Sequence, residues 1–69
     1  MNRFDATIEF LSGQKAAIIT LNQNGEWSGS SRIDLPRGSR RDLYELGYFR
    51  ASQNAACKGG TINSFRVLS

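Results

Sequence analysis

Three arginines stand where the sequence LPRGSRRDL, residues 35–43, is about to begin a helix: Arg37, Arg40 and Arg41. The planar guanidinium of arginine can hold a phosphate or a carboxylate through two hydrogen bonds, so this cluster suits the binding of an anion. The position is unusual, because a helix start carries partial positive charge and each misplaced cation costs roughly 0.3–1 kcal/mol. Either a negatively charged ligand uses these charges, or they are solvated and paired with neighbouring acids.

An anion-binding surface would draw on further cations for phosphate or carboxylate contacts and on aromatic rings that stack or pack. Trp27 and two tyrosines spaced four residues apart supply the rings, and Trp27 and Tyr44 are expected to lie near Arg37, Arg40 and Arg41. The full set of candidate binding residues is Arg32, Arg37, Arg40, Arg41, Lys58, Trp27, Tyr44 and Tyr48.

The residues needed for catalysis or metal binding are missing from the sequence. It has no histidine and one cysteine, Cys57, which excludes a Cys/His zinc site and a disulfide within one chain. No nucleophile, base and orienting group can be assembled from its scattered carboxylates. We therefore expect a protein that is not an enzyme and has no cofactor or metal, in which Cys57 serves as a small buried hydrophobic residue.

The charge of the chain is unevenly distributed along the sequence. The 69 residues carry a net charge of +3, but residues 1–31 hold two basic and three acidic residues, and residues 32–69 hold seven basic and three acidic ones. The expected partner is an anionic macromolecule, either an acidic protein surface or DNA or RNA. No apolar run is long enough for a membrane span and no secretory signal is evident, which predicts no membrane contact and a cytoplasmic location.

Strand patterns precede and follow one helical segment. Residues 3–11 alternate apolar and polar side chains, residues 16–22 form a β-branched apolar run, and a third strand runs from residue 26 to about residue 33. Asn24-Gly25 is a strong signal for a type I′ hairpin turn, and Leu35-Pro36 ends the third strand. The segment TINSFRVLS, residues 61–69, is expected to form a final strand.

The helix is predicted between a serine cap and a glycine stop. Ser39 and Asp42 approximate a capping box, and Gly59-Gly60 ends the helix after Lys58. Gly47, in the middle, predicts a kink or a close backbone approach. At 100° per residue one face holds Leu43, Leu46, Phe49 and Cys57, and a second stripe holds Tyr44, Tyr48, Ala51 and Ala55.

These elements predict a single α+β domain, residues 1–69, in the order β-β-β-α-β. We expect a small antiparallel sheet with the helix packed on one face, because a lone helix and a small sheet must cover each other's apolar sides. The last strand is expected to pair with the first, which leaves the third at an edge. The tyrosines then lie either at the rim of the core or in a contact with a partner or a second copy, as in a homodimer.

The short hairpin NGEW, the single helix after LPRGSRRDL and the closing ACKGG and FRVLS resemble, in size and layout, the small basic accessory proteins of phages, prophages and plasmids. This resemblance implies a protein that binds a host nucleic acid or blocks a host protein in the host cytoplasm. We expect a binding module that modulates or inhibits an acidic host protein through the basic helix start. The alternatives are a nucleic-acid-binding protein that uses the same arginines and a self-associating structural component.

Overall fold

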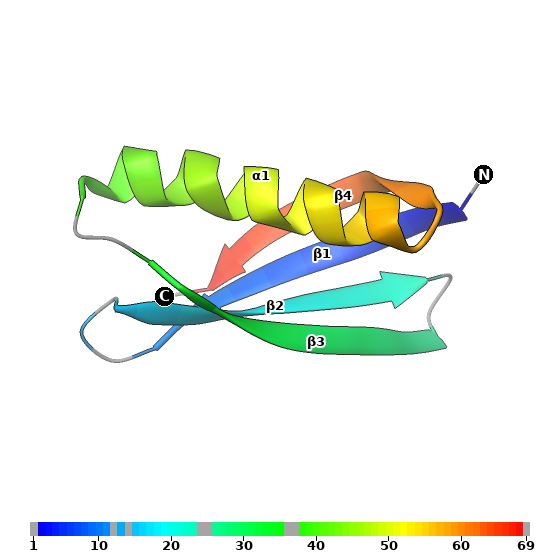
Figure 1. Cartoon of the computed structure of the whole chain (residues 1–69), viewed down its shortest axis with the longest axis horizontal. Coiled ribbons are helices and arrows are strands. Elements are labelled where there is room, and N and C mark those ends of the chain that lie inside the picture. The colour runs from blue at the N-terminus through cyan, green and yellow to red at the C-terminus, as the bar shows by residue number, and fades with distance from the viewer. Residues whose placement is uncertain (1, 12, 14, 24–25, 36–37, 69) are drawn as a thin grey trace.

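The chain forms a four-stranded sheet covered on one face by one helix, an α+β architecture (Figure 1). The computed structural model describes residues 2–11, 13, 15–23, 26–35 and 38–68, and for residues 26 and 27 the backbone alone. The elements are β1 (Asn2–Phe10), β2 (Ala16–Gln23), β3 (Glu26–Asp34), α1 (Arg40–Cys57) and β4 (Gly60–Leu68).

The strand order in the sheet is β3-β2-β1-β4, so the predicted pairing of the last strand with the first is confirmed. The prediction of an all-antiparallel sheet is wrong, because β4 runs parallel to β1. The helix explains the difference. Its 18 residues span about 27 Å, close to the length of a nine-residue strand, and return the chain to the end of the sheet where β3 began. The next strand must therefore run in the direction of β3 and β1.

The first three strands form the predicted antiparallel meander. In β1 and β2 the partners run from Phe4 opposite Gln23 to Phe10 opposite Ala17. In β2 and β3, Gln23 lies opposite Glu26, which leaves two residues for the connection. The type I′ turn predicted at those two residues, 24 and 25, and the strand-ending proline at 36 lie outside the described part of the chain.

The core lies between the helix and one face of the sheet. Alternate residues of β1 and β2 point toward the helix and are buried, whereas the residues between them lie on the face that no helix covers. The helix contributes four buried residues at a spacing of four. The buried residues of the two strands and the helix are Phe4, Ala6, Ile8, Ala16, Ala17, Ile19, Leu21, Leu43, Gly47, Ala51 and Ala55.

Neither of the two predicted stripes alone forms the inner face of the helix. Leu43 is buried and Leu46 is half-buried, but Phe49 is 56% exposed and Cys57 is also exposed. The buried face instead uses small residues, because the helix lies close to the sheet. A Cβ atom on Gly47 would stand 2.7 Å from Cδ1 of Ile8, so the predicted close approach is confirmed.

Both predicted ends of the helix are confirmed. At the start, the Ser39 hydroxyl accepts a hydrogen bond of 3.2 Å from the backbone N–H of Asp42. At the end, the backbone N–H groups of Lys58 and Gly59 donate to the carbonyls of Ala55 and Ala56. Gly59 has φ 79°, the left-handed conformation that ends a helix.

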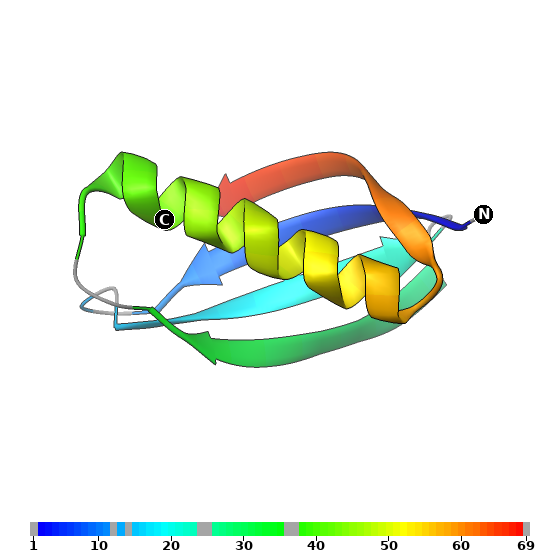
Figure 2. The same ribbon diagram turned by 45° about the horizontal axis from the view of Figure 1, so that its top comes forward.

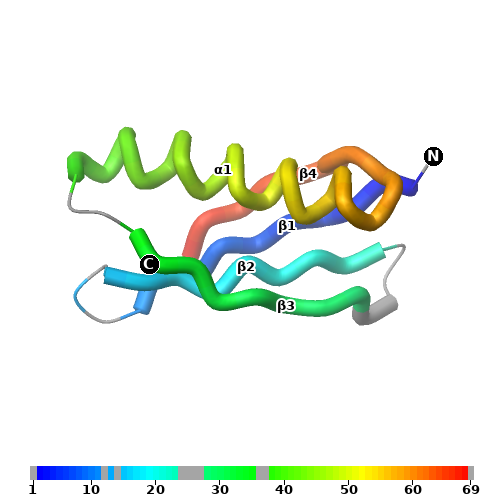
Figure 3. Tube along the Cα trace, in the orientation of Figure 1, coloured from blue at the N-terminus to red at the C-terminus, as the bar shows by residue number. Residues whose placement is uncertain are grey.

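The helix crosses the sheet diagonally (Figure 2). Its first half lies beside β4, and its second half passes toward β2 and β3 before the chain returns to β4. In the trace, β1 starts and β4 ends toward opposite ends of the long axis (Figure 3). Because of this crossing, the first half of the helix lies nearest to one sheet edge and the last turn nearest to the other.

Candidate interaction surface

The start of α1 is exposed, and its charges are largely balanced. Arg41 Nε lies 3.6 Å from Glu45 Oε1 one turn later, and the two side chains are 87% and 66% exposed. Asp42 stands in the same first turn, where a carboxylate favours the helix dipole. Arg40 and Arg41 are therefore matched by Asp42 and Glu45 in formal charge. The third arginine of the predicted cluster, Arg37, lies outside the described residues.

The other predicted cations lie elsewhere in the fold. Arg32 pairs with Ile18 on the sheet face that the helix leaves open, at the β3 edge. Lys58 ends the helix, so about 27 Å of helix separates it from Arg40. Trp27 belongs by its backbone to the start of β3, whereas the helix start follows the end of β3. The expectation that Trp27 lies near the arginines is therefore wrong.

On the open face of the sheet, the described basic residues do not gather into one patch. Arg32 and Arg66 both lie on the open face, but β3 and β4 are opposite edges of the sheet, about 14 Å apart at the usual strand spacing. Arg3 shares this face, as do the carboxylates of Asp5 and Glu9. Arg32 and Arg66 therefore lie on either side of β1 and β2 instead of forming one patch.

The two tyrosines lie together and meet a ring from the last strand. Tyr44 and Tyr48 pack edge-on against Phe65 of β4, with ring centroids 5.1 and 5.2 Å apart and interplanar angles of 79° and 89°. Each tyrosine remains 47% exposed. Edge-to-face packing of this kind stabilises the fold by about 0.5–1.5 kcal/mol per pair, in addition to the effect of the buried surface area. We call Tyr44, Tyr48 and Phe65 the aromatic shoulder.

A hydrogen-bonded bulge sets the position of Phe65. The register between β1 and β4 shifts after Phe4, so that Ile62 pairs with Phe4 but Ser64 pairs with Asp5. Asp5 Oδ1 accepts hydrogen bonds from Asn63 Nδ2 (3.2 Å) and Ser64 Oγ (2.8 Å). These two bonds, together with the nearby charge of Arg66, lower the pKa of Asp5 below its ordinary value of 3.8. The shift places Phe65 opposite Ala6, on the helix side.

Sequence reasoning singled out the tyrosines but missed Phe65, their partner from β4. Without the bulge, strict alternation from Ile62 would put residue 65 on the open face and Ser64 on the helix side. The available signal was the polar pair Asn63-Ser64, which interrupts the apolar alternation of the last strand.

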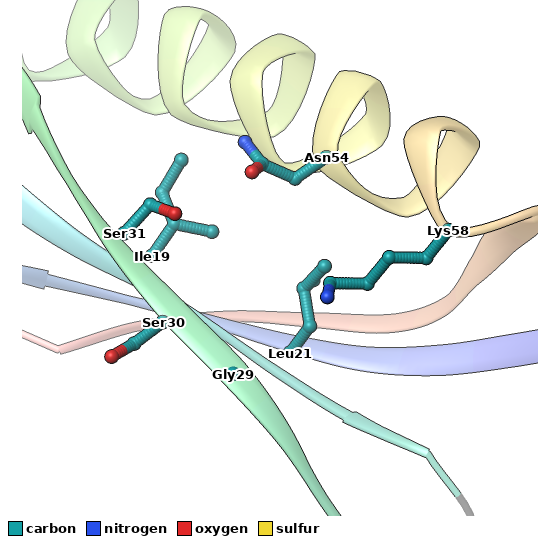
Figure 4. A pocket seen from close by; sticks show the side chains of 7 residues that line it. All are labelled: Ile19, Leu21, Gly29, Ser30, Ser31, Asn54 and Lys58. Carbon is teal, nitrogen blue, oxygen red and sulfur yellow. The ribbon is translucent and has the colours of Figure 1, made fainter.

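A shallow hollow of about 70 Å³ lies between β3 and the last turn of the helix (Figure 4). Ser31 and Asn54 face each other across it, and Lys58 extends over Leu21 toward Gly29. A Cβ atom on Gly29 would stand 3.8 Å from Lys58 Nζ. Asn54 Nδ2 donates to the carbonyl of Arg50. The hollow has room for a few small-ligand atoms or water molecules.

No protein-family model matches the chain, and no curated protein or solved structure matches it significantly. Within the described residues, no three side chains of histidine, cysteine, aspartate or glutamate gather as a metal site would require. None of the described helices has the length and apolar character of a membrane span.

Proposed function

We propose that this chain is a non-enzymatic module that binds another protein through the aromatic shoulder. The observation that carries the proposal is the edge-on packing of Tyr44 and Tyr48 on Phe65, with both tyrosines half exposed. Their rings are fixed by packing, so little conformational entropy is lost when a partner covers them. Tyrosine and arginine are enriched in protein interfaces, and Arg41 precedes Tyr44 by one turn on the same side of the helix.

The arginines beside the shoulder bear on the class of target. Arg40 and Arg41 would form a polar rim beside the shoulder, and rim charges of this kind select a partner of opposite sign and speed its association. An acidic protein surface is therefore the target we favour, and inhibition of a host protein by a phage-type accessory protein is the setting in which such a module would act. Because Asp42 and Glu45 balance the charge of these arginines, the rim should contribute more to the choice of partner than to the affinity for it.

Nucleic acid is the second candidate, and the open sheet face supports it. Arg3, Arg32 and Arg66 lie on that face among hydroxyl and amide side chains. The arginines are spread over both sheet edges and share the face with Asp5 and Glu9. We expect at most weak binding to polyphosphate from this arrangement, because affinity depends on how many phosphates are neutralised at once.

Three double variants separate the candidates. Fluorescence anisotropy of labelled DNA and RNA, titrated at several salt concentrations, should show weak binding with a shallow salt dependence, and Arg40→Glu/Arg41→Glu should change it little. Capture of proteins from a host-cell lysate should instead be lost in Tyr44→Gln/Tyr48→Gln and reduced in the arginine variant. Tight nucleic-acid binding that is abolished by Arg32→Glu/Arg66→Glu would make the second candidate the function.

A further inference from the structure

We infer that the first partner of the aromatic shoulder is a second copy of this chain, joined by antiparallel pairing of the two β4 edges about a two-fold axis at Phe65. The inference rests on the proposed function, because it uses the same shoulder, and it names the partner and the mode of contact.

The two sheet edges differ in how they are protected against pairing. The β3 edge has a register shift between Leu21 and Asn22, and Gly29 stands at that point with φ 146°. Lys58 lies against it, and a lysine and a bulge are usual means of blocking an edge. Such an edge disfavours pairing with another strand.

The β4 edge lacks these protections over its second half. From Ser64 to Leu68 its register with β1 is regular, and it carries one charged residue, Arg66. The large apolar side chains that remain exposed include Tyr44 and Tyr48 above this edge and Leu68, 45% exposed, within it. A regular edge strand beside exposed apolar side chains is a template for another strand.

The charges at this edge are compatible with contact to a second copy. Arg41 is paired with Glu45, and Arg66 lies near the carboxylate of Asp5, so the edge and shoulder present little net charge among the described residues. Two such surfaces can meet without bringing uncompensated like charges together. A two-fold contact requires a surface that can pack against an identical surface, because the same residues of both copies meet at the axis.

The position of the axis follows from the side chains of β4. An axis at Arg66 would place two guanidiniums directly opposite each other, which is unfavourable. An axis at Ser64 would already place Asn63, whose amide lies on the open face, opposite Phe65, on the helix side, because of the bulge between them. An axis at Phe65 meets the bulge only beyond its first flanking pair. An axis at Phe65 pairs Ser64 with Arg66 of the second copy, both on the open face, and brings the two aromatic shoulders together on the helix side.

The size of the contact predicts a weak dimer. The molecule measures 34 × 17 × 16 Å, so a side of 34 by 16 Å outlines about 540 Å² per copy. Two copies can therefore cover at most about 1,000 Å² in total, which is the lower limit for a specific interface. The first half of each helix lies beside β4, so the two helices would run antiparallel on one face of an eight-stranded sheet, with their starts at opposite ends.

Disulfide trapping tests the register directly. In a Cys57→Ser background, which removes the exposed native thiol, Ser64→Cys mixed with Arg66→Cys should crosslink under mild oxidation into a mixed dimer. Neither variant alone should crosslink comparably, because identical positions stand diagonally across the axis, beyond disulfide reach. The matched control on the other edge is Ser30→Cys mixed with Arg32→Cys, which should stay monomeric. Crosslinking at the β3 edge, or none at β4, overturns the inference.

The mass in solution tests the shoulder independently. The apparent mass measured by sedimentation velocity should rise from 7.7 kDa toward twice that value as the concentration increases from about 10 µM to 1 mM. Tyr44→Gln/Tyr48→Gln should lose the dimer, whereas Phe49→Gln, an exposed ring outside the shoulder, should keep it, with circular dichroism confirming that each variant folds. A chain that stays monomeric at every concentration overturns the inference. If lysate capture still depends on Tyr44 and Tyr48, the proposed function stands without it. If the tyrosine variant changes neither the mass in solution nor the lysate capture, both the dimer inference and the proposed function fail.

Discussion

Single residues decide how closely the helix approaches the sheet. Gly47 faces Ile8, which has no exposed surface, and the space between them is too small for a methyl group. The adjoining inward positions, Ala51 and Ala55, are also small and fully buried. Small side chains on the helix thus allow the larger ones of β1 to fill the space between the layers, which keeps the core close-packed.

We expect Gly47→Ala to lower the free energy of unfolding by about 1 kcal/mol, because the cost of overpacking exceeds the gain in helix propensity. The clash involves one atom, Cδ1 of Ile8, and the next nearest atoms of that side chain stand at 3.8 and 3.9 Å. In an Ile8→Val background, which removes Cδ1, the same Gly47→Ala change should become stabilising. Urea denaturation of the four proteins measures this coupling, and additive effects would contradict the packing account.

Asp5 links stability to pH. Its pKa is lowered in the folded protein by the hydrogen bonds from Asn63 and Ser64 and by the charge of Arg66. The folded chain therefore binds a proton at Asp5 less readily than the unfolded chain does. The stabilisation is complete above the unfolded pKa and is lost as the pH falls through the folded one.

We therefore expect Asp5→Asn to be less stable than the wild type at neutral pH, and the difference to shrink as the pH falls below about 4. Chemical denaturation at several pH values measures it. Glu9→Gln, on the same strand and face, is the control and should not reproduce the pattern. An equal difference at every pH would mean that the carboxylate charge is not what matters.

At the scale of the elements, the helix start explains how its arginines are tolerated. Ser39 caps the first turn, Asp42 supplies the favourable charge, and Glu45 pairs with Arg41. Because the arginine side chains are exposed, their unfavourable interaction with the helix dipole is screened by water. The helix therefore begins at Arg40 without needing a ligand.

Removal of the cap gives a prediction for this element. Ser39→Ala should lower the free energy of unfolding by about 1 kcal/mol, because the N–H of Asp42 loses its acceptor, and Ser39→Asp should retain most of the stability. Thermal unfolding followed at 222 nm measures both. Equal losses in the two variants would show that the hydroxyl itself, and not a capping acceptor, is required.

Much of the fold was predictable because its signals are local. The alternation of β1, the apolar run of β2, and the serine and glycine at the two ends of the helix each act within a few residues. The parallel β4 and the bulge that turns Phe65 toward the helix depend on contacts across the whole chain. The inner face of the helix was misjudged for a related reason: a close approach selects Gly47 and Ala51, which carry a weak apolar signal, and leaves Phe49 outside.

At the scale of the whole molecule, β4 completes the structure on two sides. It covers one edge of β1, and through Phe65 and the half-buried Ile62 it packs against the helix and the core. Its first residue, Gly60, passes so close to β1 that a Cβ atom there would stand 2.6 Å from the ring of Phe4. The strand is thus a structural part of the core, as well as the edge to which a second copy would bind.

Deletion of β4 should therefore unfold the chain. A variant that ends at Lys58 leaves β1 as a bare edge and removes the strand that the first half of the helix lies beside, in a domain whose core is already small. We expect its circular dichroism to lack a cooperative thermal transition. Phe65→Leu in the full chain is the milder comparison and should fold with reduced stability. A cooperative transition in the truncated chain would show that the first three strands and the helix suffice.

The pairing of β1 with β4 also has a consequence for how the chain is made. Asp5 and Asn63 are hydrogen-bonded although 58 positions separate them, so the central strand waits for the last strand to leave the ribosome. Until then the nascent chain can form its hairpins, but β1 presents an unpaired edge and an apolar face. Folding is therefore completed only once β4 has emerged, and the interval before then is when a chaperone would have most to protect.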